Sequence, residues 1–230
     1  GGTGVVSDDV LSSLRALPKL ATSPMTQVVR LAGPNRFETS AAVASKIHTL
    51  LGTSYSGRVL FVNGYKYADA VAAAGLAYNK KLPVILTDSS KAPTASVDAV
   101  KSLGATKALV VGGATVVSDA AITSLGITGQ RIAAGSDRYD TAAKLATYVT
   151  TSEGFTWSRM YLVSGETIVD ALAGGPLAGK YGAPMLFMRR TSVPSPTATA
   201  VIAHQLTDRY LLGGESAVSA SAVQALDALH

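Results

Sequence analysis

Short apolar runs alternate with longer alanine-rich segments along most of the chain. The apolar runs have the length of strands and end in Gly, Asn or Thr, which is typical of buried strands that stop at a turn. In the first half we expect strands at 28–32, 59–62, 84–86 and 108–111, and helices at about 37–51, 67–80, 94–103 and 118–125. Strands that are apolar throughout are expected in a parallel sheet covered on both faces. The pattern predicts an α/β, Rossmann-like fold with parallel sheets covered by helices.

The same pattern occurs twice. Residues 58–77, RVLFVNGYKYADAVAAAGLA, are matched by residues 159–178, RMYLVSGETIVDALAGGPLA. The run RFET at 36–39 is matched by RYDT at 138–141, and LVVGGATVVS at 109–118 is matched by LLGGESAVS at 211–219. Self-similarity of this kind indicates tandem units. We place the two units at residues 26–127 and 128–230.

The opening residues resemble the end of a unit. GGTGVVSDDVLSSL at 1–14 is similar to GGATVVSDAAITSL at 112–125. We therefore expect residues 1–25 to be the tail fragment of a preceding repeat, which makes the sequence a piece of a longer protein. The alternative is a natural or processed start whose helix packs on a neighbour.

Each unit has the residues of a capped helix start. Asn35 and Asp137 are good N-capping residues, and an acid follows three positions later, at Glu38 and Asp140. In the first unit this is close to a capping box, in which the cap side chain and the acid each accept a hydrogen bond from a free backbone amide. Helix capping is therefore a sufficient explanation of these four residues.

Capping does not explain the arginine between cap and acid. Arg36 and Arg138 lie in the first turn, where a cation opposes the helix dipole by roughly 0.3–1 kcal/mol. Each arginine therefore needs a compensating partner. Either a structural carboxylate such as Asp69 or Asp170 or an anionic ligand at the strand ends would serve. Burial beside a protein carboxylate favours the structural reading, and an open groove favours a ligand.

Polar residues also recur after the second predicted strand of each unit. Asn63 and Ser164 begin a turn with glycine, and Asp69 and Asp170 fall early in the next helix. In open α/β sheets ligands bind at this carboxyl edge of the strands. The alternative is that the two acids stabilise the start of a helix. The segment 174–180 has the glycine and lysine spacing of a nucleotide-binding loop, but it lies in a predicted helix and lacks the required Ser or Thr.

Composition narrows the class of protein. The chain is 47% hydrophobic with a mean hydropathy of +0.28, which is ample for buried cores, and no apolar run approaches the roughly 18 residues of a membrane span. It has no cysteine, and His48, His204 and His230 are scattered without the spacing of metal ligands. GxSxG and HExxH motifs are both missing. We expect a non-enzymatic protein with no metal, no cofactor and no membrane span.

The net charge of +5 is unevenly distributed. Residues 1–130 hold 12 Lys and Arg against 7 Asp and Glu, whereas residues 131–230 hold 8 of each. The cationic field favours anionic partners. No block of basic residues resembles a nucleic-acid-binding arm, so we expect no nucleic acid partner.

The set of repeated motifs resembles the cell wall binding repeat 2 family. The motifs are R-[LI]-A-G-x-[ND]-R-[FY]-[ED]-T, N/S-G-x-x-x-x-D-A, L-P-V-[IL]-L and V-G-G-x-x-x-V-S, and together they cover nearly the whole chain. The resemblance implies tandem Rossmann-like repeats, usually three, that attach an effector region non-covalently to anionic wall polymers such as teichoic-type polymers. It also implies an extracellular, wall-associated protein of a Gram-positive bacterium. The motif positions, which are our candidate ligand-binding residues, are Arg30, Arg36, Glu38, Thr39, Asn63, Asp69, Arg131, Arg138, Asp140, Thr141, Ser164 and Asp170.

The second unit departs from the family pattern. It has one residue more before Arg138 than the first unit has before Arg36, and Ala183 stands where the family has leucine. The first unit is therefore the better candidate for polymer contact. Two other functions remain open from the sequence: a structural assembly module whose repeats pack together or form homo-oligomers without carbohydrate affinity, and a small-molecule enzyme or sensor with a closed pocket at the strand ends.

Overall fold

A computed structural model describes residues 1–17, 28–206 and 208–229. The elements of the first part are α1 (Asp8–Ala16), α2 (Arg36–Leu51), the short 3-10 helix η1 (Gly52–Ser54), β1 (Arg58–Asn63), α3 (Ala68–Ala72), α4 (Ala74–Asn79), β2 (Val84–Thr87), α5 (Thr94–Ser102), β3 (Lys107–Val111) and α6 (Asp119–Thr123). Those of the second part are β4 (Thr128–Ala133), α7 (Arg138–Ser152), β5 (Met160–Ser164), α8 (Val169–Tyr181), β6 (Met185–Met188), α9 (Ser195–His204), β7 (Arg209–Leu212) and α10 (Ala220–Asp227). The predicted helix at 67–80 is divided at Ala73 into α3 and α4.

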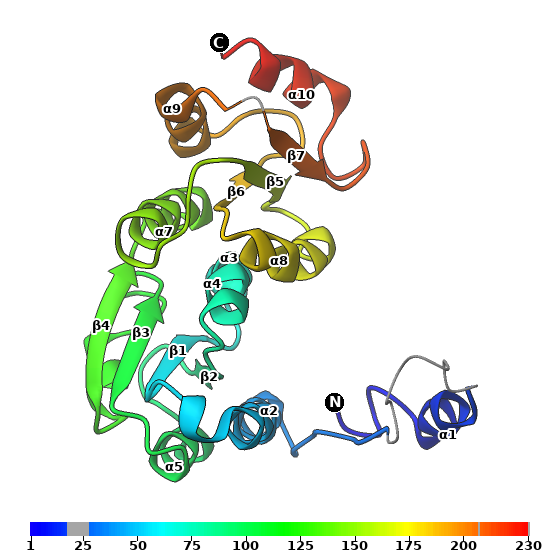
Figure 1. Cartoon of the computed structure of the whole chain (residues 1–230), viewed down its shortest axis with the longest axis vertical. Helices are drawn as coiled ribbons and strands as arrows, with labels where there is room; N and C mark the ends of the chain where they lie inside the picture. Colours follow the sequence, from blue (N-terminus) through cyan, green and yellow to red (C-terminus); the bar gives the residue numbers. More distant parts are fainter. Residues whose placement is uncertain (18–27, 207, 230) are drawn as a thin grey trace.

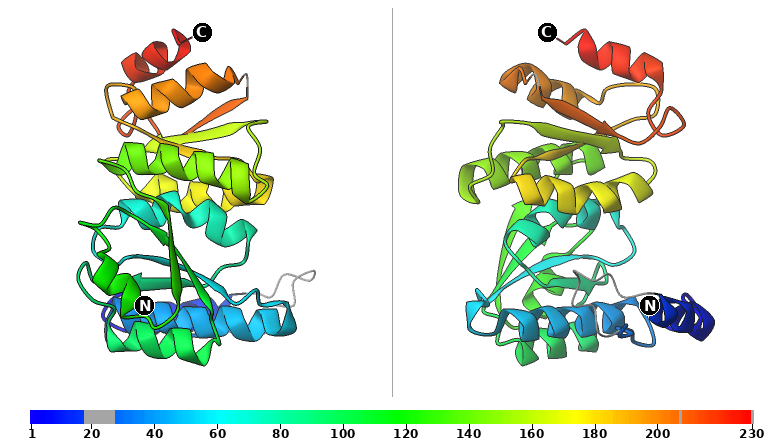
Figure 2. Two further views of the ribbon diagram at one scale, coloured as in Figure 1. Left: turned by 90° about the vertical axis from the view of Figure 1, so that its left-hand side faces the viewer. Right: turned by 45° about the vertical axis from the view of Figure 1, so that its right-hand side comes forward.

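The strands form two parallel sheets, which confirms the predicted α/β class. The first sheet has the order β2-β1-β3-β4 and the second has the order β6-β5-β7. Helices and sheets alternate in layers along the molecule, from α2 and α5 at one end to α10 at the other (Figures 1 and 2). The segment 174–180 lies inside α8, as predicted, and not in a loop between a strand and a helix.

One strand crosses the boundary between the repeats. By sequence β4 opens the second unit, but it pairs in parallel with β3 of the first unit, with Lys107 opposite Thr128. The equivalent strand predicted at 28–32 is wrong, because these residues have no regular structure. The physical reason is that a strand of this kind belongs to the sheet of the preceding repeat. Within the described part of the chain, no strand lies beside residues 28–32 to pair with them.

The two units share a core. One face of the first sheet, including Phe61, packs against α2 and α5. The other face, including Leu60, belongs to a hydrophobic cluster that continues through α4, α7 and α8 to Tyr161 and Phe187 of the second sheet. The units therefore bury apolar surface against each other, and their relative position is fixed by packing.

Small residues let α4 and α8 come close together. A Cβ atom added at Gly179 of α8 would lie 2.4 Å from the carbonyl oxygen of Gly75 in α4, and the Asn79 side chain donates a hydrogen bond of 2.8 Å to the Gly179 carbonyl. At the edge of this contact, Arg58 forms two hydrogen bonds with the carboxylate of Glu153, at 2.9 and 3.1 Å. The junction thus combines close backbone packing with a partly buried ion pair.

Candidate functional site

The second unit begins with an arginine that binds the end of the first. Arg131 on β4 donates hydrogen bonds to the carbonyl oxygens of Gly112 and Val117 and forms an ion pair of 2.6 Å with Asp119. These three groups follow β3 and surround the start of α6. We call this set of acceptors an arginine receptor, made of the glycine carbonyl, the valine carbonyl and the acid.

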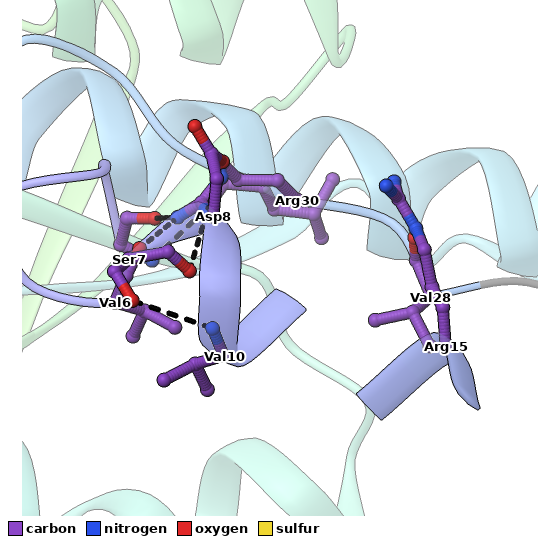
Figure 3. Close-up of polar contacts among 9 residues, drawn as sticks. Val6, Ser7, Asp8, Val10, Arg15, Val28 and Arg30 are labelled. Carbon is purple, nitrogen blue, oxygen red and sulfur yellow. Dashed lines mark hydrogen bonds and ion pairs between the residues drawn. The ribbon is translucent and has the colours of Figure 1, made fainter. Parts of the chain in front are cut away.

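The N-terminal tail forms a second arginine receptor. Arg30 donates hydrogen bonds to the carbonyl oxygens of Gly1 at 2.9 Å and Val6 at 2.8 Å and forms an ion pair of 3.0 Å with Asp8 (Figure 3). In sequence these acceptors are the counterparts of Gly112, Val117 and Asp119. The geometry therefore gives the candidate residue Arg131 a structural role in holding the second unit on the first, and it gives Arg30 the same kind of role between the N-terminal residues and the first unit.

The helix-opening arginines find a partner that sequence reasoning did not consider. Arg36 donates a hydrogen bond of 2.7 Å to the carbonyl oxygen of Gly64, and Arg138 donates one to the carbonyl oxygen of Gly165. Each bond ties the start of a helix to the glycine turn of the same unit. Among the described residues, no carboxylate lies within 4.0 Å of either guanidinium. Both arginines are exposed, which leaves them capacity for a ligand.

The predicted helix caps are formed, but the acids behave differently in the two units. Asn35 accepts hydrogen bonds from two amides of the first turn, and Asp137 accepts one. Asp140 accepts a hydrogen bond of 2.8 Å from the Ser136 amide and forms an ion pair with Lys144. Glu38 completes no capping box: one of its carboxylate oxygens is buried without a partner among the described residues.

A cleft of about 320 Å³ lies at the junction of the two units. One wall is the loop that follows β1 and the start of α3, and the opposite wall is the start of α7 with the turn before it. The cleft is lined by Tyr65, Lys66, Tyr67, Ala68, Asp69, Gly113, Thr115, Val116, Gly135, Ser136, Asp137, Arg138 and Thr141. Of the predicted site residues, the fold therefore brings together Asp69 from the first unit with Arg138 and Thr141 from the second.

Asp69 is the buried acid of this cleft. Its exposed fraction is 6%, and burial raises its pKa to about 6. A hydrogen bond with Thr141 and the charges of Arg138 and Lys66 act in the opposite direction. The aspartate also lies against Gly112, where a Cβ atom would be 2.9 Å from a carboxylate oxygen. The site therefore places a buried acid with a raised pKa near two cations.

The cationic wall is shaped by a buried amide. The Asn63 side-chain oxygen accepts hydrogen bonds of 2.8 Å from the amides of Tyr65 and Lys66, while its nitrogen donates to the carbonyl oxygen of Val116 at 2.7 Å. Asn63 is 1% exposed, so it acts by positioning this loop. In the second unit the hydroxyl of Ser164 accepts the equivalent two amide bonds.

The threonines of the motif brace the turn before each helix. Thr39 accepts a hydrogen bond from the Gly33 amide, and Thr141 accepts one from the Gly135 amide, both at 3.1 Å. Neither turn has room for a side chain at its glycine, since a Cβ atom at Gly135 would lie 2.2 Å from the Thr141 nitrogen. The threonines therefore hold in place the turns that precede Arg36 and Arg138.

The first unit has an incomplete version of the same cleft. A groove of about 740 Å³ is lined by residues 1, 2, 4 and 5 of the tail, by Arg36 and Thr39 and by apolar side chains of α2 and β2. In sequence the tail residues correspond to 112–116, but among the described residues nothing equivalent to the loop at 65–69 lines the groove beside Arg36. Ser164 and Asp170, at the far end of the second unit, line neither this groove nor the junction cleft.

Sequence reasoning missed Tyr65, Lys66 and Tyr67. Tyr65 and Tyr67 are 55% and 50% exposed, and the guanidinium carbon of Arg36 lies 4.4 Å from the centre of the Tyr65 ring. Because Arg36 lines the groove and Tyr65 lines the junction cleft, this contact makes the groove and the cleft neighbours. The available signal was the cation between two aromatic residues immediately after the Asn-Gly turn, which the second unit replaces with Glu166, Thr167 and Ile168.

In the regions that the structure describes, no three His, Cys, Asp or Glu residues are grouped so that they could hold a metal ion. None of the described helices combines the length and the apolar character needed to cross a bilayer.

Comparison with known proteins gives consistent results. Residues 30–122 and 131–223 match the family described as Cell wall binding domain 2 (CWB2). The chain is 34% identical over 195 residues to N-acetylmuramoyl-L-alanine amidase LytC of Bacillus subtilis (strain 168), a match that covers 84% of this chain and 37% of that protein. It is 27% identical over 229 residues to the Amidase enhancer of the same organism, covering 98% of this chain and 29% of that protein.

Two solved structures share the fold. Cwp6 from Clostridium difficile matches with a TM-score of 0.75 and 22% identity, over 96% of this chain and 38% of that one. Cwp8 from Clostridium difficile matches with a TM-score of 0.70 and 21% identity, over 86% of this chain and 33% of that one. The chain thus spans between 29% and 38% of the length of these four proteins.

Proposed function

The chain belongs to the cell wall binding domain 2 family, and from this premise we propose that its two repeats attach a secreted or surface protein non-covalently to anionic polymers of the Gram-positive wall. The family match carries the wall-binding role, and the relatives named above are similar over the same repeats. That the wall polymer is anionic is our inference. The module has no catalytic role of its own in this proposal, and any enzymatic activity belongs to another part of the protein.

The cations that line the junction cleft are the main support for an anionic ligand. Lys66 and Arg138 both line the cleft; Lys66 donates a hydrogen bond of 3.2 Å to the Thr115 carbonyl oxygen and Arg138 donates one to the Gly165 carbonyl oxygen, and among the described residues neither forms an ion pair with a carboxylate. A phosphate or carboxylate group would give both cations a charged partner through charge-assisted hydrogen bonds. The exposed rings of Tyr65 and Tyr67 offer flat apolar faces for sugar rings beside that charge.

The contact between Arg36 and Tyr65 supports a polymer rather than a small molecule. It joins the junction cleft to the groove lined by Arg36, so a chain with regularly spaced anionic groups can contact both hollows. Several weak contacts along one polymer add through effective concentration. The structural assembly function would have been favoured by burial of Arg36 and Arg138 beside carboxylates, and the structure shows both exposed.

Sedimentation with purified walls tests the proposal. The chain should sediment with intact walls, and the bound fraction should fall when salt rises from about 50 to about 500 mM, because salt screens exposed charges. It should also fall after the anionic polymers are extracted from the walls. Undiminished binding to stripped peptidoglycan would exclude the anionic polymer as the ligand.

A pair of variants assigns the binding to the cleft. Lys66→Ala should reduce wall binding about threefold, since one exposed charge contact contributes up to about 1 kcal/mol. Lys46→Ala removes another exposed lysine, from α2, and serves as the matched control. Equal losses in the two variants would indicate a diffuse charge effect instead of binding at the cleft.

A further inference from the structure

The junction cleft is lined by cations and acids in equal number. The cations are Lys66 and Arg138, and the acids are Asp69 and Asp137. Asp137 is the N-cap of α7 and forms an ion pair of 4.0 Å with Arg189, which lies outside the lining, so its charge is compensated there. Asp69 is the acid that remains to offset the two cations of the cleft.

Two units enclose the carboxyl group of Asp69. The residue lies in the first turn of α3, and one of its oxygens is packed against Gly112 at the end of β3. From the second unit, Thr141 of α7 makes a hydrogen bond with the same side chain. The acid is therefore held at the junction, beside the cations that would bind a ligand.

The charge of Asp69 depends on a balance between burial and the two cations. Burial favours the neutral form and raises its pKa to about 6, whereas the charges of Arg138 and Lys66 favour the carboxylate. The other elements that pack on α3 are β1, α4 and α8, and none of their charged side chains lines the cleft. The remaining titratable side chains of the cleft are Tyr65, Tyr67 and Asp137. An anion bound beside the two cations would weaken their effect on Asp69 and so favour its protonated form.

We propose that Asp69 is a specificity-determining residue of the junction cleft, which binds anionic groups of the wall polymer more tightly when the Asp69 carboxyl group is protonated. In the ionised state the carboxylate competes with the ligand for Lys66 and Arg138. In the protonated state both cations are left to the ligand, and the cleft gains one net positive charge. Wall binding therefore strengthens as the surroundings become more acidic. This inference rests on the proposed binding of anionic polymers, to which it adds a regulating residue.

The direction of the effect is fixed by linkage. A ligand that prefers the protonated cleft raises the affinity for the proton by the same factor, so that binding takes up protons. Because the pKa of Asp69 is about 6, acidification from about pH 7.5 to about pH 5 changes the residue from mostly ionised to mostly protonated.

Sedimentation with purified walls at these two pH values tests the proposal. On acidification the original 230-residue chain should gain about threefold more affinity than Asp69→Asn, which cannot ionise, as expected for one charge contact. At pH 7.5 the asparagine variant should bind about threefold more tightly than the original chain. Charges of the walls and of the histidines change equally for both chains and cancel in this comparison. Asp170→Asn is the matched control, because Asp170 lines neither the cleft nor the groove beside Arg36, and it should retain the full response.

A second measurement does not depend on the folding of the asparagine variant. The original chain is titrated calorimetrically at pH 6 with anionic polymer extracted from the walls, in two buffers that differ in ionisation enthalpy. Binding should be accompanied by proton uptake, and Asp170→Asn should show the same uptake.

The outcomes separate this inference from the proposed function. Equal pH responses of the original chain and Asp69→Asn, or binding without proton uptake, would overturn the role of Asp69 and leave the binding of anionic polymers in place. Equal binding to intact and stripped walls at both pH values would overturn the polymer binding itself, and the role of Asp69 with it.

Discussion

The N-terminal junction and the junction between the two units contain the same motif in different surroundings. At both, a leading arginine binds an arginine receptor, and a capped helix presents a second arginine. Among the described residues, the leading segment forms a strand at the junction between the units but not at the N-terminal one, and the basic loop at 65–67 lines a cleft with the helix start at the former. The motif thus supplies half of a junction, and the neighbouring repeat supplies the other half.

This comparison explains why the motif arginines have unequal importance. Arg131 binds groups around Gly112 and Val117, which are buried, whereas Arg30 binds a tail whose helix α1 has no buried residue. The same hydrogen bonds therefore support a core in one case and a surface segment in the other. Substitutions at equivalent positions of the two junctions should therefore change the free energy of unfolding by different amounts.

The largest effect is expected where the units pack backbone against backbone. Gly179→Ala would place a methyl group 2.4 Å from the Gly75 carbonyl oxygen, and overpacking of this kind costs roughly 1–3 kcal/mol. Urea unfolding should show that loss. The control Gly214→Ala adds a methyl group where nothing lies within 4 Å, and its change should stay within about 0.5 kcal/mol. Similar losses for both variants would mean that the close contact between α4 and α8 is not the cause of the lost stability.

The leading arginines come next. Arg131→Ala leaves the buried Gly112 carbonyl without its side-chain donor, and the free energy of unfolding should fall by about 2 kcal/mol. Arg30→Ala should change global stability by less than about 0.5 kcal/mol, because it releases only the exposed tail. Urea titrations of the two variants, followed by circular dichroism, provide the measurement. A loss for Arg30→Ala as large as that for Arg131→Ala would contradict the contrast between the junctions.

The repeat, the fold class and the helix caps were predictable, because each depends on residues close together in the sequence. Asn35 and Asp137, for example, accept hydrogen bonds from backbone amides two or three residues further along the chain. The strand at 28–32 was predicted wrongly because an apolar pattern cannot say which sheet a strand joins. The cleft was only partly predictable, since it joins non-equivalent positions of successive repeats. Lys66 faces Arg138, a juxtaposition that aligning the repeats position by position does not reveal.

A smaller effect should appear in the pH dependence of stability. The folded chain holds the proton of Asp69 more tightly than the unfolded chain, because burial raises the pKa of this acid to about 6. Its protonation therefore stabilises the fold, and this contribution is lost as the pH rises through 6. Between about pH 7 and about pH 5 it should add about 1 kcal/mol to the free energy of unfolding.

Asp69→Asn isolates this contribution. The asparagine variant should lack the gain on acidification that Asp69 provides, as measured by thermal or urea unfolding at both pH values. Asp170→Asn changes the half-buried counterpart in the second unit and is the matched control. If the difference between the original chain and Asp69→Asn is the same at both pH values, Asp69 does not titrate in this range.

The smallest effect concerns the loops that distinguish the two units. Tyr65→Glu, Lys66→Thr and Tyr67→Ile together give the first unit the loop of the second, replacing a cation by an anion in the junction cleft. Two exposed charge contacts of up to about 1 kcal/mol each are altered, so wall binding should weaken about fivefold. In the 230-residue chain, the reciprocal change, Glu166→Tyr, Thr167→Lys and Ile168→Tyr, places the basic loop where, among the described residues, no helix start of another unit lies. Sedimentation with walls should then show no gain, because a basic loop binds only when the next repeat supplies the opposite wall. A gain as large as the first loss would show that the loop binds by itself and that the cleft between repeats is not needed.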